Sequence, residues 1–478
     1  EDPALADACA GLLLVEAEDE ESEASAVAIL MRETLETPGR SAMLVTPDRT
    51  LGRRVAAKMR RWNVTLDDSA GVPFANSPCG TYLRLAAQWL AAPGDPQAAL
   101  ALAKSALAGF GLDHGARRRA AAALDEGLRG LAPSGGVEGL RARVIAAAER
   151  RPTLAERAAP VLERFSEAAK GWPQDGAAPF AALLDAHIAA AETLAADDAE
   201  PGDARMWRGE DGEAGAMLIA DLRMAAPTLE RIAPGDYPRA FAQLLSGSTV
   251  RRRAPAHPRL SILGPLEARL QSADLVILGG LNEGAWPGGA GADPLLSRAM
   301  PAQVGLPSPE RRTGLSAHDF AQGAAAPNVA LTRAKRAGGA PTKPSRWIVR
   351  LKNILDGAGA LDAADRSLSL AAWAAGLDEA GPQRRVPPPR PAPPFDARPR
   401  RLFVTQVETW LRDPYAIYAR HILGLQSLDP LAEPFGAKHL GKLLHKVFER
   451  AAVVPADRSR LSAFVAEEAP AYGLGEVE

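Results

Sequence analysis

The sequence contains few cysteines and aromatic residues, no excess of charge and no long apolar run. Its 478 residues include two cysteines, Cys9 and Cys79, too few for a disulfide scaffold or for an iron–sulfur cluster ligated by cysteines of this chain alone. The 56 Lys and Arg nearly balance the 58 Asp and Glu, which argues against a chain that coats nucleic acid non-specifically. Without a membrane-spanning run or a recognisable signal peptide, we expect a cytoplasmic protein with no membrane partner.

The remaining composition is that of a folded protein. Hydrophobic residues make up 47% and charged residues 24%, which excludes wholesale disorder. The length predicts about two to four packing units. The chain opens with Glu-Asp-Pro rather than Met, so we expect it to be a portion of a longer protein.

The first part of the chain has the pattern of an α/β domain. Apolar residues with helical spacing occupy 24–35, and a short apolar run at 41–45 predicts a buried strand. A turn and a basic helix ending at Trp62 follow. Strand, turn and helix in this order indicate a parallel sheet covered by helices, and we assign residues 1–85 to its first part.

Composition then changes twice along the chain. Residues 86–250 are rich in Ala, Leu and Arg with helical spacing, which predicts an α-helical insertion. Strand character returns at 260–263 and 274–278, so we assign 251–355 to the second part of the sheet domain. Eight prolines between 382 and 399 predict a semi-rigid linker, placed at 356–400, before a further domain at 401–478.

The loop after the second of these strands is the first candidate site. Glycine-rich residues 279–289 follow a buried strand, and open parallel sheets bind ligands at the carboxyl ends of their strands. Such a loop is equally typical of a rigid structural turn. Trp286 has two possible roles, since an exposed ring can stack on a base, whereas a buried one would fill a gap between two domains.

Five segments together resemble a known family. Residues 43–49, 274–287 and 329–336 are similar to motifs IVa, V and VI of UvrD-type superfamily 1 helicases, in the form found in AddB subunits of AddAB helicase–nucleases. Residues 404–410 and 441–445 resemble the opening of a RecB-type nuclease domain. The pair Asn-Glu-Gly-x-Trp-Pro and Leu-Thr-Arg-Ala is the most specific part of a resemblance that covers nearly the whole chain.

The resemblance implies a fold and a function. The fold would be α/β, a RecA-like parallel-sheet domain interrupted by an α-helical 2B-type insertion and followed by a partial PD-(D/E)xK nuclease-like domain. The protein would be the C-terminal portion of a subunit of an ATP-dependent helicase–nuclease (exonuclease) that repairs DNA double-strand breaks by homologous recombination. It would bind and track single-stranded DNA beside an AddA-like helicase–nuclease subunit in a heterodimer.

Site residues follow from the same motifs. Arg333 matches the motif VI arginine that reaches the γ-phosphate of ATP, where such a residue can raise the rate about 10³–10⁵-fold. The alternative is an arginine lying over the sheet edge without a catalytic role. Asn282, Glu283 and Trp286 match the motif V loop, and with Arg346 they are the expected DNA contacts.

ATP binding belongs to the assembly rather than to this chain. The glycine-rich string closest to a P-loop runs from Gly436 to Lys442, but Leu443 stands where the Mg²⁺-binding hydroxyl is needed and no strand precedes it. We therefore expect no ATP hydrolysis by the chain alone, and whether it is an enzyme by itself stays open.

The nuclease-like segment supplies one candidate metal ligand. In the family that it resembles, the histidine corresponding to His445 helps to hold Mg²⁺ or Mn²⁺, with carboxylates as the other ligands. Those carboxylates and a lysine are expected downstream of residue 478. Many AddB proteins place an iron–sulfur cysteine where this chain has Asp413, so we expect no iron–sulfur cluster.

Two further interpretations remain. One is a non-catalytic DNA-binding scaffold or recognition subunit whose helicase and nuclease sites have degenerated. The other is a truncated UvrD-type helicase, which the nuclease-like tail argues against.

Overall fold

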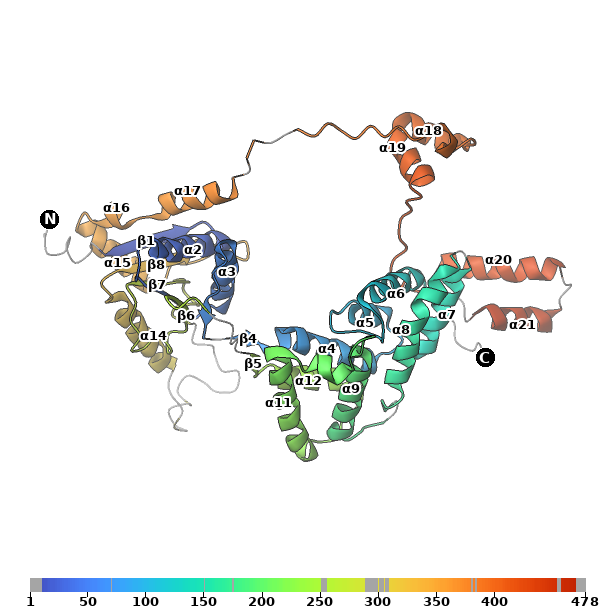
Figure 1. Ribbon diagram of the computed structural model, residues 1–478, viewed down its shortest axis with the longest axis horizontal. Helices are drawn as coiled ribbons and strands as arrows, with labels where there is room; N and C mark the ends of the chain where they lie inside the picture. The colour runs from blue at the N-terminus through green and yellow to red at the C-terminus, as the bar shows by residue number, and fades with distance from the viewer. Residues whose placement is uncertain are drawn as a thin grey trace. The chain divides into compact units, whose positions relative to one another are not determined.

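The protein forms two compact units, each described below by itself. Residues 1–71 with 251–385 make up the sheet unit, and residues 72–250 with 386–478 make up the helical unit. The structure, a computed structural model (Figure 1), describes residues 11–69, 71–149, 151–173, 176–250, 256–288, 300, 305, 309–379, 381–382, 385–453 and 457–469.

The sheet unit is built on six strands paired in parallel in the order β1-β8-β7-β2-β6-β3. In the middle of the sheet, Leu44 of β2 lies opposite Ile277 of β7 on one side and Ile262 of β6 on the other. The strands are β1 (Leu12–Ala17), β2 (Ala42–Val45), β3 (Asp67–Asp68), β6 (Leu260–Leu263), β7 (Leu275–Leu278) and β8 (Val329–Ala334).

Helices cover both faces of this sheet, because alternate residues of its strands point to opposite sides. Val15, Leu44 and Ile277 belong to the apolar cluster shared with α2 and α3, whereas Leu14 and Val276 belong to the cluster on the α14 and α15 side. The other elements of this unit are α2 (Glu20–Glu36), α3 (Arg49–Met59), η1 (Arg60–Trp62), α14 (Pro309–Ala324), the hairpin β9 (Arg336–Ala337) and β10 (Ala340–Pro341), α15 (Arg346–Gly357), α16 (Leu361–Ala364) and α17 (Ser367–Asp378).

Most predicted elements of the sheet unit are confirmed. The apolar runs become β2, β6 and β7, and the basic segment becomes α3 with η1. The sequence prediction missed β1, which pairs with β8 at the edge of the sheet. The α/β class with a parallel sheet is thus correct.

The helical unit is a bundle around one apolar core. Aromatic rings fill its centre, with Trp89 stacked on Phe165 and Tyr237 stacked on Phe241. The elements before the proline-rich stretch are β4 (Val72–Pro73), η2 (Phe74–Asn76), α4 (Pro78–Ala91), α5 (Pro96–Ala103), α6 (His114–Gly127), α7 (Gly136–Ala148), α8 (Thr153–Ala169), α9 (Phe180–Ala195), α10 (Gly202–Met206), α11 (Gly209–Ala225), η3 (Ala226–Thr228), α12 (Tyr237–Leu245) and β5 (Thr249–Val250).

The C-terminal part of this unit docks on the bundle through backbone hydrogen bonds. The amide of Gly130 donates to the carbonyl of Pro430 (2.8 Å), and the amide of Glu433 donates to the carbonyl of Gly130 (2.7 Å). The Asp413 side chain caps the helix that Pro414 begins. The elements are η4 (Phe395–Ala397), α18 (Val404–Arg412), α19 (Pro414–Ile417), the π-helical turn η5 (Tyr418–Ile422), α20 (Ala437–Val453) and α21 (Arg458–Glu468).

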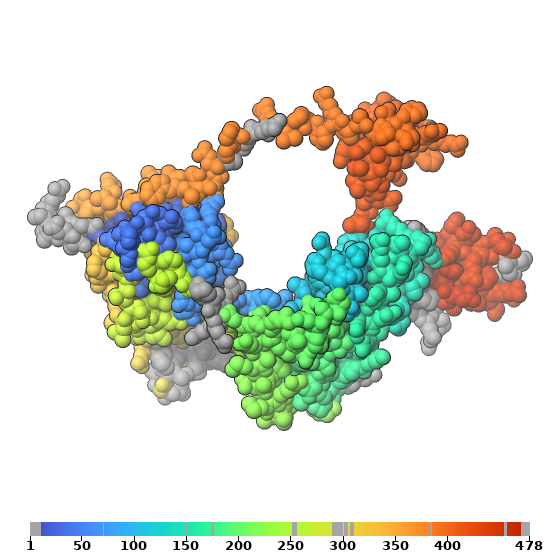
Figure 2. Space-filling model, viewed as in Figure 1, coloured from blue at the N-terminus to red at the C-terminus, as the bar shows by residue number. Residues whose placement is uncertain are grey.

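Two of the expected boundaries need correction. The division expected at 85/86 falls inside α4, which lies wholly in the helical unit. The linker expected from residue 356 begins later, because α17 packs on α2 with Leu370 fully buried. Residues 386–394 carry no helix or strand and are almost entirely exposed, and Figure 2 shows this stretch as a thin line of atoms.

No helix in the described ranges is both long enough and apolar enough to cross a membrane.

Candidate functional site

The candidate site lies where β2 and β7 end side by side. After β2 the chain runs to β3 on one side of the sheet, and after β7 it runs to β8 on the other side. This reversal is the switch point at which open α/β sheets bind ligands, outside the carboxyl ends of the strands. The loops that begin there are residues 46–48 after β2 and residues 279–288 after β7.

Two glycines let the loops approach each other closely. A Cβ atom at Gly279 would lie 2.8 Å from the Leu51 side chain, and Gly280 has a φ of +75°, which favours glycine. A Cβ at Gly280 would also lie 3.3 Å from Thr46 Oγ1. Close packing at Gly279 and the backbone conformation at Gly280 therefore favour glycine at these two positions of the turn.

A buried carboxylate, missed by the sequence analysis, ties the loop after β7 to strand β8. Glu23 of α2 is 3% exposed, and its Oε1 accepts hydrogen bonds from the amide of Gly280 (2.8 Å) and the hydroxyl of Thr332 (2.7 Å). Burial raises the pKa of Glu23, although both hydrogen bonds act in the opposite direction. A sequence signal existed, since Glu23 interrupts the apolar face of α2.

Asn282 links the loop after β7 to the end of β8. Its Nδ2 donates to the carbonyl of Ala334 (3.1 Å), and its Oδ1 accepts from Arg333 Nε (3.0 Å). Its backbone carbonyl accepts from the amides of Ala285 and Trp286. Both polar groups of the side chain are thus used within the unit.

Glu283 and Arg346 form a two-pronged ion pair at the start of α15. Arg346 Nε donates to Glu283 Oε1 (2.8 Å) and Nη2 donates to Oε2 (3.2 Å). The Arg346 hydrogen bonds lower the pKa of Glu283, and the carboxylate raises the pKa of Arg346. The Arg346 side chain is 61% exposed, so among the predicted DNA contacts it presents a charge to solvent.

Trp286 does not have the exposed position that base stacking requires. Its side chain is 1% exposed and lies edge-on to Phe320 and Trp347, with centroids at 6.3 and 6.5 Å. The stacking expectation is corrected accordingly, because the indole is buried in the apolar cluster on the α14 and α15 side of the sheet. Trp286 is a buried packing residue, as the structural alternative held, but it fills a gap within one unit rather than between two domains.

Arg333 is 4% exposed and fully engaged. Nη1 donates to Glu16 Oε1 (2.7 Å) and Nη2 to Thr342 Oγ1 (3.0 Å), in addition to the bond from Nε to Asn282. Lys352 also donates to Glu16. Burial alone would raise the pKa of Glu16, but the hydrogen bonds from Lys352 and Arg333 outweigh it and lower this pKa. Neither the catalytic nor the sheet-edge alternative anticipated this buried position.

The structure therefore brings five of the six predicted site residues together at one edge of the sheet. Asn282 is hydrogen-bonded to Arg333, and the next residue along the loop, Glu283, is paired with Arg346. Glu16 was missed because β1 was not predicted, although the apolar run Leu12–Val15 before a charged segment is typical of a buried strand.

His445 belongs to the other unit. It lies on the exposed side of α20, opposite the buried Leu443 and Val447. Among the described residues, no group of three or more His, Cys, Asp or Glu side chains is arranged to hold a metal ion. Its role as a ligand stays a prediction.

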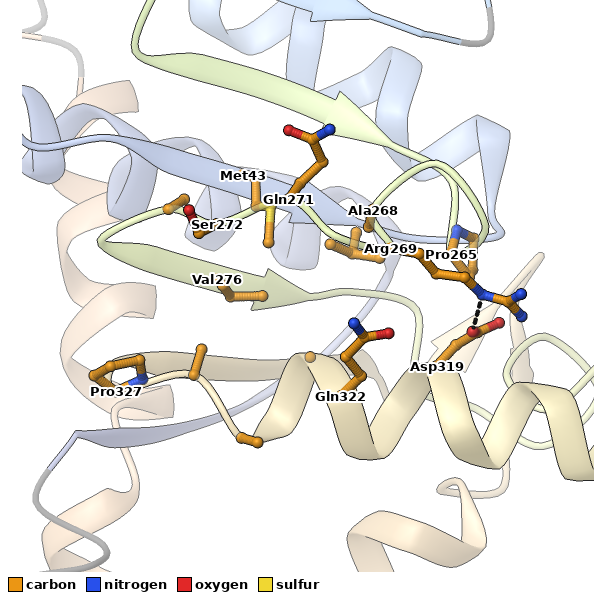
Figure 3. A pocket seen from close by; sticks show the side chains of 15 residues that line it. Met43, Pro265, Ala268, Arg269, Gln271, Ser272, Val276, Asp319, Gln322 and Pro327 are labelled. Atoms are coloured by element: carbon orange, nitrogen blue, oxygen red, sulfur yellow. Dashed lines mark hydrogen bonds and ion pairs between the residues drawn. The ribbon is translucent and has the colours of Figure 1, made fainter.

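A separate cavity of about 190 Å³ opens beneath α14 (Figure 3). Met43 and Val276 form its apolar floor, and Arg269 pairs with Asp319 of α14 at 2.7 Å on one side. The predicted site residues do not line it. The ion pair fastens the connection between β6 and β7 to α14, which accounts for this region structurally.

Comparison with known proteins gives relatives without a described activity. No protein-family model matches the chain. It is similar to uncharacterized proteins of Rickettsia felis (24% identity over 263 residues, 54% of this chain and 30% of the relative) and Rickettsia bellii (26% over 247 residues, 51% and 29%). The similarity to one of Rickettsia conorii is 24% over 244 residues, 51% and 28%. The chain thus matches less than a third of the length of each relative.

Proposed function

We propose that this chain is part of an AddB-type subunit that handles single-stranded DNA in an ATP-dependent helicase–nuclease. The sheet unit would be the second RecA-like domain, the helical bundle its 2B-type insertion, and the segment from α18 onward the start of a nuclease domain. Its setting would be cytoplasmic repair of double-strand breaks, beside an AddA-like subunit that supplies the active ATPase.

One observation carries this proposal. The residues matched to motif V, 282–283, lie in the loop after β7, and Arg333 of motif VI lies on the neighbouring strand β8. A hydrogen bond from Arg333 to Asn282 joins them at the carboxyl edge. Ligands of open parallel sheets bind at that edge. Arg346 extends the same group towards solvent as a cation suited to a phosphate.

The burial of Arg333 favours the non-catalytic form of this function. An arginine finger has to reach a phosphate, whereas this guanidinium is bonded to Glu16, Asn282 and Thr342. The chain would then act as a DNA-binding scaffold whose partner carries out ATP hydrolysis and, if the nuclease site after His445 is incomplete, strand cutting. Mg²⁺ or Mn²⁺ and ATP remain cofactors of the assembly.

The test is ATP-dependent unwinding of linear duplex DNA by the chain reconstituted with its helicase partner. If the chain is a non-catalytic scaffold, Arg333→Ala should reduce unwinding only in proportion to the loss of folded protein. Glu16→Gln is the matched control, since it disturbs the same ion pair while leaving the guanidinium in place. A loss specific to Arg333→Ala at equal folded fraction would show that Arg333 acts on the nucleotide. No stimulation of the partner by the wild-type chain would contradict the proposed function.

A further inference from the structure

A slot between three helices of the sheet unit has a lining unlike that of the cavity beneath α14. It has a volume of about 240 Å³ and lies between α2, α3 with η1, and α17, on the opposite face of the sheet from α14. Its lining includes the small side chains of Ser25, Ala28 and Ala57, which are too short to fill the space between the helices. Trp62 and Leu377 form its larger walls.

The lining contains two cationic side chains, and each is paired with a carboxylate. Lys58 Nζ lies 2.5 Å from Glu21, and Arg61 pairs with Asp378 at the end of α17. Lys58 and Arg61 are three residues apart, so they face the same side. Asp378 lies at a helix C-terminus, where the helix dipole disfavours a carboxylate, and Arg61 offsets this.

Size limits what the slot can hold. Its volume exceeds the ~150 Å³ of a cavity that takes one benzene ring, and it is smaller than the ~300 Å³ at which pockets for drug-sized ligands begin. One planar ring system fits inside, while an attached anionic group would remain at the rim beside Lys58 and Arg61.

We propose that this slot binds one base of a single-stranded nucleic acid against Trp62, with the adjoining phosphate on Lys58 and Arg61. An aromatic wall beside cations is the combination by which proteins hold single strands without reading their sequence. The phosphate takes the place of Glu21 and Asp378, and this exchange costs little because exposed ion pairs contribute about 0.2–1 kcal/mol. The inference rests on the proposed function, which makes the strand DNA.

Neutralising the competing carboxylate gives the sharpest test. The Asp378→Asn variant should bind a fluorescently labelled oligothymidylate about 1.4- to 5-fold more tightly than wild type, the factor that corresponds to one exposed ion pair. The adjacent Glu379→Gln removes the same charge outside the slot and should leave affinity unchanged. A gain of affinity cannot come from misfolding, so the comparison stays decisive even if either variant loses stability.

Removing the cations should act in the opposite direction. Lys58→Ala with Arg61→Ala should weaken binding and make its logarithmic salt slope shallower by about 0.7, the contribution of one phosphate on a single strand. Arg311→Ala with Arg312→Ala removes two exposed cations of α14 on the opposite face and should change neither quantity. Trp62→Leu should weaken binding about 5- to 150-fold, whereas Trp62→Phe keeps a stacking ring and most of the affinity.

The possible outcomes distinguish a failure of the slot proposal from a failure of the proposed function. If wild type binds no oligothymidylate, the proposed function fails and the slot with it. If wild type binds but Asp378→Asn and Glu379→Gln behave alike, or the two double variants do, the slot is overturned while DNA binding stands. If the slot variants change the affinity for oligouridylate as much as that for oligothymidylate, the slot binds single strands of both DNA and RNA. If they change the affinity for oligouridylate alone, the assignment of the slot to DNA is overturned.

Discussion

Arg333 and Glu16 form an ion pair across the two neighbouring strands β8 and β1. The guanidinium is 4% exposed, and removing it leaves Glu16 with Lys352 as its remaining cationic partner while Asn282 and Thr342 lose a donor. Breaking a buried ion pair by removing one partner typically costs about 3–5 kcal/mol. We therefore expect Arg333→Ala to lower the free energy of unfolding of the sheet unit by about 3 kcal/mol, measured by urea denaturation. A loss below about 0.5 kcal/mol, the level of an ordinary surface substitution, would contradict the bonding described for Arg333.

The raised pKa of the buried Glu23 predicts an unusual pH dependence of the stability of the sheet unit. Because burial raises its folded-state pKa above the ordinary 4.5, the stability linked to it is fully present below pH 4.5 and is lost as pH rises through the folded-state value. Glu23→Gln keeps a side-chain oxygen for Gly280 and Thr332 and carries no charge. The variant should therefore gain melting temperature relative to wild type as pH increases above 4.5. Parallel melting curves of the two proteins across pH would contradict the raised pKa.

His187 of the helical unit gives the opposite dependence. Its ring is fully buried between Tyr237 and Phe241, and its nitrogens lie 3.0 Å from the Tyr237 hydroxyl and 2.9 Å from the carbonyl of Leu83. Burial lowers the pKa of His187 from 6.5 to about 4, so the linked stability is present above pH 6.5 and is lost as pH falls towards 4. The loss amounts to about 3 kcal/mol by pH 4.

The His187→Gln variant tests this value. It should be less stable than wild type at pH 7, because its amide fills the ring's place poorly. Between pH 6.5 and 4, urea denaturation should show a smaller loss for the variant than for wild type. Equal losses would mean that other groups account for the acid sensitivity.

At the scale of elements, the sequence predicted what depends on local pattern. The buried runs of β2, β6 and β7 and the basic helix α3 were readable because continuous apolar strands and helical spacing are local signals. The edge strand β1 was missed, and with it the partner of Arg333. Burial of Trp286 and Arg333 follows from long-range packing against α14 and β1, which no local pattern encodes.

The tight approach of the two loops at the switch point can be tested with one substitution. Gly280→Ala places a methyl group on a residue with φ of +75° and 3.3 Å from Thr46 Oγ1, so we expect a cost of about 1–2 kcal/mol in the free energy of unfolding. Gly357→Ala is the control, because Gly357 ends α15 with open space around it, and it should be neutral or slightly stabilising. The same cost at both positions would mean that the loop approach is looser than described.

At the scale of the whole molecule, the two units each have their own apolar core, and the chain crosses between them at 71/72, 250/251 and 385/386. At the proline-rich crossing, residues 386–394 form a long and almost entirely exposed stretch. Limited trypsin digestion should therefore cut first after Arg385, Arg400 or Arg401, since Arg390 and Arg398 each precede a proline. First cuts within α4–α12, read by mass spectrometry, would contradict the compact helical bundle.

We propose above that this chain handles single-stranded DNA without an ATPase of its own. The most direct measurement is fluorescence anisotropy of a labelled single strand titrated with the purified chain, without ATP or divalent metal, at several salt concentrations. We expect saturable binding that weakens as salt rises, because arginine and lysine side chains neutralise the phosphates. An absence of binding even at low salt would contradict it.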